Sequence, residues 1–265
     1  MCELFAFSSS SPTRAHFSLE EFRLHGCSKG PHCDGWGLAF YEGKFAQVYR
    51  DEKPAAFSEW MSFLLGHEHY SNCVISHIRK ATQGGISLQN TQPFSRECHG
   101  ARHVFAHNGN LEGFKERCSF DSYQPIGDTD SEYAFCTLMD AVQALWREST
   151  PTLEQRLSVL SEKFSAWSPL GPANIIYSDG EYLFAFANRR TQSDGNIEPP
   201  GLYYLSRDEE THKRLNKLVG VELDGHVQAI TLFASVPLSA ESWQPLEENE
   251  LLACKSGQIV AKMQL

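Results

Sequence analysis

The sequence predicts an α+β fold in which β-sheets are sandwiched between helices. Strand-like segments are frequent along the chain, whereas helical segments are fewer, stronger and grouped in blocks. A strict alternation of strand and helix is missing, which argues against a doubly wound parallel sheet. We therefore expect sheets that are covered by helices on their outer faces.

Short runs rich in apolar, β-branched and aromatic residues predict the strands. Turn residues between neighbouring runs predict two hairpins, with Glu42-Gly43-Lys44 in the first turn and Ser178-Asp179-Gly180 in the second. In chain order the predicted strands are residues 3–7, 37–41, 45–49, 73–78, 102–107, 173–177, 181–187, 201–206, 228–235, 251–255 and 259–263.

Three segments carry apolar residues at helical spacing, and they are residues 57–69, 131–146 and 153–167. Thr129 or Asp130 can cap the second of these helices. Residues 8–12 predict a short loop, and the polar, Pro- and Gly-rich residues 191–201 predict a mobile one. Neither loop is long enough to separate two domains.

Composition excludes several classes of protein. The 265 residues carry a formal net charge of −10 and no run of Lys or Arg, which argues against nucleic acid as a partner. The longest apolar runs are too short to span a membrane, and the N-terminus lacks the basic and apolar regions of a signal peptide. We expect a cytoplasmic protein with neither nucleic acid nor membrane as a partner.

Eight cysteines are scattered without Cys-x-x-Cys pairs, a pattern typical of reduced thiols in a cytoplasmic protein. Four residues, His25, Cys27, His32 and Cys33, cluster loosely in the sequence. Their spacing does not close a tetrahedral zinc site, so we interpret them as core or loop residues and expect no metal.

Cys2 is the most informative residue, because it stands at the head of a predicted strand. If Met1 is removed, Cys2 carries both a thiol and an α-amino group. That amine, with a pKa of about 7.7–8.0, can act as the general base for its own side chain. An ordinary small residue after the start codon is the alternative interpretation.

Two further segments could serve a cysteine nucleophile. Arg79 stands where a predicted strand runs into a glycine-rich loop, and its planar guanidinium suits a carboxylate; a surface ion pair is the alternative. Asn108 and Gly109 end another strand and could donate hydrogen bonds to a developing oxyanion, although an Asn-Gly pair is also common in hairpin turns.

Two more segments combine a structural and a functional interpretation. The acidic residues of Gly127-Asp128-Thr129-Asp130-Ser131-Glu132 suit a helix start, and one carboxylate could face a substrate ammonium. The glycines of Asp34-Gly35-Trp36-Gly37 indicate either close backbone approach near a pocket or a tight turn with a core Trp.

Taken together, and in their order along the chain, these motifs resemble the class II glutamine amidotransferases, which are of the N-terminal-nucleophile type. The closest resemblance is to the stand-alone YafJ-type branch. The resemblance covers residues 2 to about 135 and then thins to Ala234-Ser235-x-Pro237-Leu238 with Trp243. The motifs that carry it are Cys2, Asp34-Gly35-Trp36-Gly37, Arg79-x-Ala81-Thr82-x-Gly84, Asn90-x-Gln92-Pro93-Phe94, His107-Asn108-Gly109 and Thr129-Asp130-Ser131-Glu132.

The resemblance implies a four-layer αββα sandwich of the N-terminal-nucleophile hydrolase type, with residues 1–265 forming a single glutamine amidotransferase type-2 domain. It implies a glutaminase reaction on L-glutamine through a Cys thioester, without a cofactor. The implied catalytic residues are Cys2, Asn108 and Gly109. The implied substrate-binding residues are Arg79, Thr82, His107 and Asp130, with Arg79 on the α-carboxylate and Asp130 on the α-ammonium.

The sequence departs from the family at three positions. Lys80 and Gln83 stand where synthase-linked relatives often carry Trp and His, and Val236 stands where many close relatives carry an acid. No synthase domain is expected within the chain, so the ammonia would be released or passed to a separate synthase subunit. Two alternatives stay open: a γ-glutamyl hydrolase that acts on a γ-glutamyl peptide or metabolite, and a non-catalytic glutamine-binding sensor or scaffold.

Overall fold

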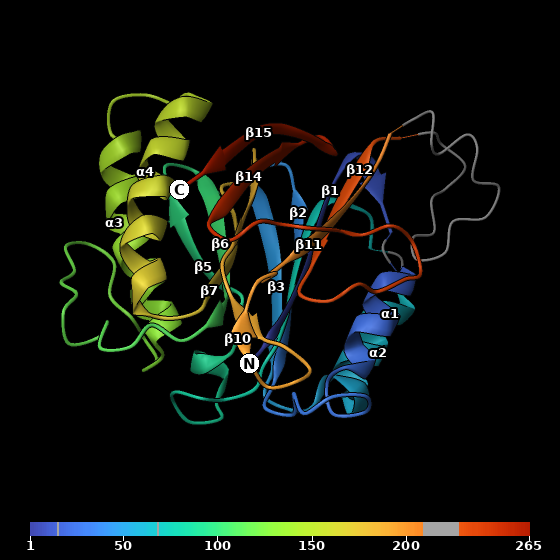
Figure 1. Cartoon of the computed structure of the whole chain (residues 1–265). Coiled ribbons are helices and arrows are strands. Elements are labelled where there is room, and N and C mark those ends of the chain that lie inside the picture. The colour runs from blue at the N-terminus through green and yellow to red at the C-terminus, as the bar shows by residue number, and fades with distance from the viewer. Residues whose placement is uncertain (15, 68, 209–227) are drawn as a thin grey trace.

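Strands make up most of the regular structure of this computed structural model, which describes residues 1–14, 16–67, 69–208 and 228–265. Within these residues the strands form two large antiparallel sheets and one small hairpin, and helices flank the two large sheets (Figure 1). The structure therefore confirms a mixed fold of helices and antiparallel sheets.

The first sheet has seven strands among the described residues, in the order β13-β11-β12-β1-β4-β2-β3. Their bounds are β13 (Gln244–Pro245), β11 (Tyr203–Arg207), β12 (Ile230–Ala234), β1 (Glu3–Thr13), β4 (Ser71–Ile78), β2 (Trp36–Glu42) and β3 (Phe45–Asp51). Its central strand, β1, pairs with β12 on one side and with β4 on the other.

The second sheet has six strands among the described residues, in the order β15-β14-β8-β7-β6-β5. Their bounds are β15 (Gln258–Gln264), β14 (Glu250–Lys255), β8 (Leu183–Ala187), β7 (Ala173–Ser178), β6 (Ala101–Gly109) and β5 (Phe94–Cys98). A separate hairpin consists of β9 (Arg190–Thr191) and β10 (Ile197–Glu198).

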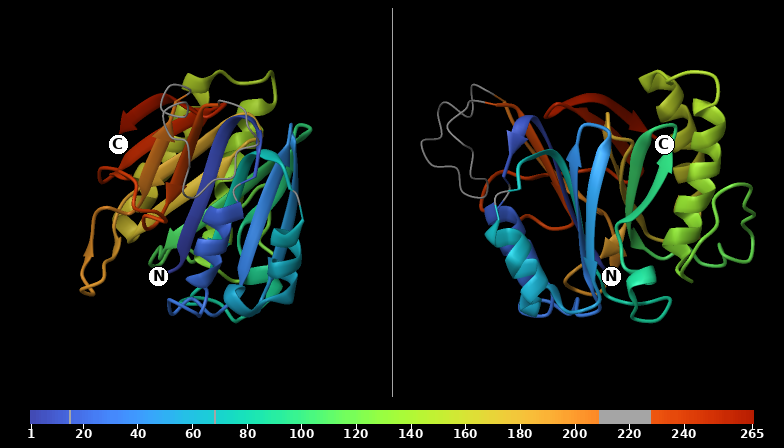
Figure 2. Two further views of the ribbon diagram at one scale, coloured as in Figure 1. Left: turned by 90° about the vertical axis from the view of Figure 1, so that its right-hand side faces the viewer. Right: turned by 180° about the vertical axis from the view of Figure 1, so that it is seen from behind.

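Helices cover the outer faces of the sheets. The α-helices are α1 (His16–Leu24), α2 (Glu59–Gly66), α3 (Asp130–Trp146) and α4 (Leu153–Trp167), and the short 3₁₀ helices are η1 (Ala55–Phe57), η2 (Leu88–Asn90) and η3 (Ser168–Leu170). Figures 1 and 2 show α1 and α2 beside the seven-stranded sheet, and α3 and α4 on the far side of the six-stranded sheet.

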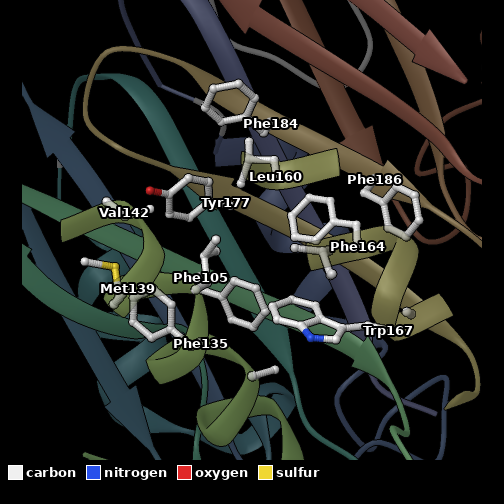
Figure 3. Close-up of a cluster of buried hydrophobic side chains, with 14 of the residues drawn as sticks. Phe105, Phe135, Met139, Val142, Leu160, Phe164, Trp167, Tyr177, Phe184 and Phe186 are labelled. Carbon is white, nitrogen blue, oxygen red and sulfur yellow. The ribbon is translucent and has the colours of Figure 1, made fainter. Parts of the chain in front are cut away.

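Three buried apolar clusters among the described residues hold these parts together, and the alternation of side chains along each strand assigns residues to them. Phe5 and Phe7 of β1 point toward α1 and α2, whereas Leu4 and Ala6 point toward the other sheet. On β6, Phe105 joins the aromatic cluster beneath α3 and α4, which Figure 3 shows in close-up. Because both faces of β1 are covered over Leu4, Phe5, Ala6 and Phe7, this part of the strand is apolar throughout.

The strands and helices predicted from the sequence are confirmed in place and type, with boundaries that differ by a few residues. The predicted helix 57–69 corresponds to α2, and its residue 68 lies outside the described residues. Sequence patterns missed α1, β5 and the two-residue strand β13.

One loop prediction is wrong, and a second predicted loop contains a short hairpin. Residues 8–12 lie within β1, where Ser8 pairs with both Thr231 and Cys73, so the sheet overrides the low strand propensity of a serine run. Residues 191–201 include the β9–β10 hairpin, in which Thr191 pairs with Ile197.

Candidate active site

Cys2 lies immediately before β1, the central strand of the seven-stranded sheet. Its Sγ accepts a hydrogen bond from the Lys80 N–H at 3.3 Å and lies 3.4 Å from the Lys80 carbonyl oxygen. Burial raises the pKa of the Cys2 thiol, while the Lys80 backbone N–H, the amino terminus and the Arg79 charge act in the opposite direction. The thiol is thus held neutral and needs a base to become a nucleophile.

Arg79 follows β4 directly and is buried. Its guanidinium donates hydrogen bonds to the carbonyl oxygens of Gln83, Gly84 and Gly85 at 3.0, 3.3 and 3.0 Å. These bonds fasten the glycine-rich loop to the end of the strand. A guanidinium has five N–H groups, so others stay available for a carboxylate. Thr82 lies in the same loop and is exposed.

The glycine-rich loop is also fastened to its neighbours. The Asp34 carboxylate accepts a hydrogen bond from the Ala81 N–H at 2.7 Å, and the Gln83 side chain donates one to Asn110. Gly84 has a positive φ of 70°, a conformation that favours glycine. The loop therefore closes across the space between β4 and the end of β6.

Asn108 and Gly109 end β6, in the second sheet. The Asn108 side chain is fully buried, and its Nδ2 lies 3.3 Å from Ser235 Oγ. The Asn110 N–H donates to the Pro172 carbonyl at 3.0 Å, toward β7. Successive N–H groups of a strand point to opposite sides, so the Gly109 N–H points away from β7.

His107 and Asp130 are buried behind this strand end. His107 Nδ1 lies 2.9 Å from the Ser131 hydroxyl, and the Asp130 carboxylate accepts the Leu111 N–H at 2.7 Å. Burial lowers the pKa of His107, which favours the neutral imidazole. His107 thus connects β6 to the first turn of α3, and its expected contact with substrate stays a prediction.

The structure brings the predicted site residues together from both sheets. The Lys80 N–H, next to Arg79, donates to Cys2 Sγ, and the Gln83 side chain donates to Asn110, next to Gly109. Three of the predicted site residues, Arg79, Asn108 and Asp130, are buried, so their charges and dipoles act in a low-dielectric setting.

Sequence reasoning missed two residues that organise this site. Ser235 Oγ accepts the Leu4 N–H at 3.0 Å as well as the Asn108 amide, and Asn174 Nδ2 donates to the carbonyls of Asn108 and Arg189 at 3.0 and 2.9 Å. Both contacts with Asn108 join residues at least 66 positions apart in the chain. The motif Ala234-Ser235-x-Pro237-Leu238 was the one local signal, and it gave Ser235 no role.

One sequence expectation about cysteines is wrong. Cys27 and Cys33 form a disulfide, so not all eight thiols are reduced. His32 lies in the loop that this bond closes and is buried. His25 lies before the loop, and its Nδ1 is 2.6 Å from the carboxylate of Glu3, the residue that follows Cys2. Within the described residues, no group of three His, Cys, Asp or Glu side chains is placed to hold a metal ion.

Comparison with known proteins identifies the family of this chain. The family model of class-II glutamine amidotransferases matches residues 1–265. The chain belongs to that family. It is 31% identical over 256 residues to the Escherichia coli protein named "Putative glutamine amidotransferase YafJ", covering 94% of this chain and 96% of that one. A Haemophilus influenzae protein named "Putative glutamine amidotransferase" is also 31% identical, with 99% of this chain and 87% of that one covered.

Solved structures agree with this assignment to the class II glutamine amidotransferases. A crystal structure titled as a predicted glutamine amidotransferase from Pseudomonas aeruginosa has a TM-score of 0.71 and 29% identity, and the alignment covers 98% of this chain and 100% of that one. Glutamine phosphoribosylpyrophosphate amidotransferase from B. subtilis shares the fold, with a TM-score of 0.61 at 14% identity; the alignment covers 99% of this chain and 49% of that enzyme. No helix in the described part of this chain is long and apolar enough to cross a membrane.

Proposed function

We propose that this chain hydrolyses the γ-amide of L-glutamine through Cys2, after removal of Met1, and releases glutamate and ammonia. One observation carries the proposal: Ser235 connects the strand that begins after Cys2 to the side-chain amide of Asn108 in the other sheet, at 3.0 and 3.3 Å. A nucleophile and an oxyanion donor are thereby held on facing strands. Residues 1–265 would form one domain, a four-layer αββα sandwich.

In the proposed reaction the Cys2 α-amine takes the thiol proton and the sulfur attacks the γ-carbonyl carbon. The oxyanion that forms would accept hydrogen bonds from Asn108 Nδ2 and the Gly109 N–H. The amine then gives its proton to the leaving nitrogen, ammonia departs, and water cleaves the thioester to yield glutamate. Arg79 would bind the α-carboxylate, with Thr82 lining the same pocket, and Asp130 would bind the α-ammonium.

The test is covalent labelling of Met1-free protein by 6-diazo-5-oxo-norleucine, followed by intact mass and peptide mapping. We expect one adduct, on Cys2, together with ammonia release from glutamine by the unlabelled protein. Cys2→Ser is the matched control and should show neither. Met1-free protein that forms no adduct and turns over no γ-glutamyl compound would overturn the proposal.

A γ-glutamyl hydrolase is the second candidate, and Arg190 favours it. The carbonyl of the preceding residue, Arg189, is bonded to the same Asn174 amide that holds Asn108. The Nε of Arg190 is buried and has no hydrogen-bond partner among the described residues. Its charge lowers the pKa of the Met1 amino group, after the larger effects of burial, Cys2, Lys80 and Glu3.

Arg190 would then bind an anionic leaving group, such as the carboxylate of a γ-glutamyl dipeptide. Arg190→Gln should raise the KM for a γ-glutamyl dipeptide by roughly tenfold and leave that for glutamine unchanged. Arg189→Gln is the matched control, because Arg189 pairs with Glu248 instead. An equal change in KM for both substrates would mean that Arg190 does not bind the leaving group.

An ammonia-accepting synthase subunit fits the first candidate. Activation of glutamine hydrolysis by a co-purifying protein would support such a partner. Full activity of the chain alone would count against it.

A further inference from the structure

Ser235 follows β12 at the point where this strand reaches the beginning of β1. It is almost fully buried, and its backbone N–H donates to the Leu4 carbonyl at 3.0 Å. Its Oγ accepts two hydrogen bonds, from the Leu4 N–H at 3.0 Å and from Asn108 Nδ2 at 3.3 Å. A hydroxyl oxygen has two lone pairs, so both are in use.

The Asn108 side-chain amide has few other restraints. Its Oδ1 is buried and has no hydrogen-bond partner among the described residues. Asn174 holds the backbone carbonyl of Asn108 but not its side chain. Within the part of the chain that the structure describes, Ser235 is therefore the hydrogen-bond partner that fixes the rotation of this amide.

We propose that Ser235 is a positioning residue for the oxyanion hole. It holds one N–H of Asn108 Nδ2, so that the second N–H faces the oxyanion oxygen that forms when Cys2 attacks the carbonyl, and it fixes this amide against the strand of the nucleophile. The inference rests on the proposed amidohydrolase function, and it assigns Ser235 no contact with substrate.

Loss of the hydroxyl leaves the amide free to rotate, and its dipole is no longer aimed in advance at the developing oxyanion. Ser235→Ala should therefore lower kcat by roughly 10- to 100-fold. KM should change little, because Arg79 and Asp130 would bind the α-groups of the substrate. Loss of folded protein would also lower the apparent kcat at unchanged KM, so a matched control for destabilisation is needed.

A double-mutant cycle with Asn108→Ala tests the proposal. Asn108→Ala should lower kcat by about 10²- to 10³-fold. If Ser235 acts through this amide, the double variant should be no slower than Asn108→Ala alone. Multiplicative losses would overturn the proposal, because Ser235 would then act independently of Asn108.

Ser71→Ala is the matched control. Ser71 is also a buried serine whose hydroxyl accepts a backbone N–H, that of Tyr41 at 3.0 Å, but it belongs to the other end of β4 from Arg79. Its substitution should leave kcat unchanged. A loss of kcat as large as that of Ser235→Ala would assign the effect to general destabilisation.

A readout without turnover separates this inference from the proposed function. Solvent exchange of the Asn108 side-chain amide protons, followed by NMR, should become at least about tenfold faster in Ser235→Ala. Unchanged exchange would show that Ser235 does not hold the amide, whatever the activity. A different outcome is faster exchange in the variant together with no labelling and no turnover in the wild type. That outcome would overturn the proposed function, and the contact between Ser235 and Asn108 would then have no catalytic role.

Discussion

Gly109 shows how closely backbone packing constrains the candidate site at the scale of one residue. A Cβ at this position would overlap the Pro172 carbonyl oxygen and approach the His107 ring. The Pro172 carbonyl is fixed, because it already accepts the Asn110 N–H. Only glycine therefore allows the end of β6 to pack this closely against the Pro172 carbonyl.

Gly109→Ala should move the proposed oxyanion N–H and lower kcat by about 100-fold or more. Gly66→Ala is the control, because a Cβ there meets no atom within 4 Å. The measurement is steady-state glutamine hydrolysis together with thermal unfolding of both variants. Near-normal kcat in Gly109→Ala would remove the Gly109 N–H from the mechanism.

The candidate site was predictable where one residue carries its own chemistry. Cys2 and Arg79 could be proposed because a thiol and a guanidinium each suggest a partner, whereas Asp130 was singled out among its neighbouring acids only by the resemblance to the family. The roles of Ser235 and Asn174 could not be predicted, because they come from contacts with Asn108, which lies at least 66 positions away in the chain. The Cys27–Cys33 bond was missed because the two cysteines are six positions apart, a spacing that signals no motif.

At the scale of elements, Asn90 connects two loops that the site needs. Its side chain is buried, donates to the Gly85 carbonyl at 3.0 Å and to the Asp128 carboxylate at 2.6 Å, and accepts the Asp128 N–H at 3.0 Å. The first contact reaches the glycine-rich loop after Arg79, and the other two reach the segment before α3. One side chain therefore sets the spacing between Arg79 and Asp130.

Asn90→Ala should loosen both loops together and raise the KM for glutamine by roughly tenfold or more, with a smaller effect on kcat. Asn72→Ala, which removes a hydrogen bond to the Ser9 carbonyl elsewhere in the sheet, is the control. KM and kcat from initial rates provide the measurement. If kcat fell while KM held, Asn90 would be assigned to the chemical step instead.

Helices and strands were predictable where the local sequence pattern and the burial of the segment favour the same secondary structure. The strands of both sheets are apolar runs bounded by turn residues, and α3 and α4 have capping threonines at residues 129 and 152. The polar half of β1 and the strand β5 were missed because pairing with neighbouring strands, not their own propensity, makes them extended.

At the scale of the whole molecule, the interface between the sheets places the site and also buries titratable groups. His77 of β4 is fully buried, and neither ring nitrogen has a hydrogen-bond partner among the described residues. Burial, with smaller effects of Arg79 and the His107 and His32 charges, lowers the pKa of His77 to about 3. The same cause lowers the pKa of His103 to about 4.

These shifts predict that acid destabilises the fold. The folded-state pKa of His77 lies below the ordinary value of 6.5, so between pH 6.5 and about 3 the unfolded state binds more protons. Stability contributed by the neutral ring is therefore complete above pH 6.5 and decreases as the pH falls through this window. Between pH 7 and pH 5 the loss from His77 alone should be about 2 kcal/mol.

Urea unfolding at the two pH values measures this dependence. His77→Leu removes the titrating ring, so the difference in unfolding free energy between pH 7 and pH 5 should shrink by about 2 kcal/mol, even if the variant is less stable at both. His99→Asn, at an exposed position with positive φ, controls for the loss of an imidazole. An undiminished pH dependence in His77→Leu would mean that His77 is not held neutral, and the interface beside the candidate site would then have to admit water or a charge.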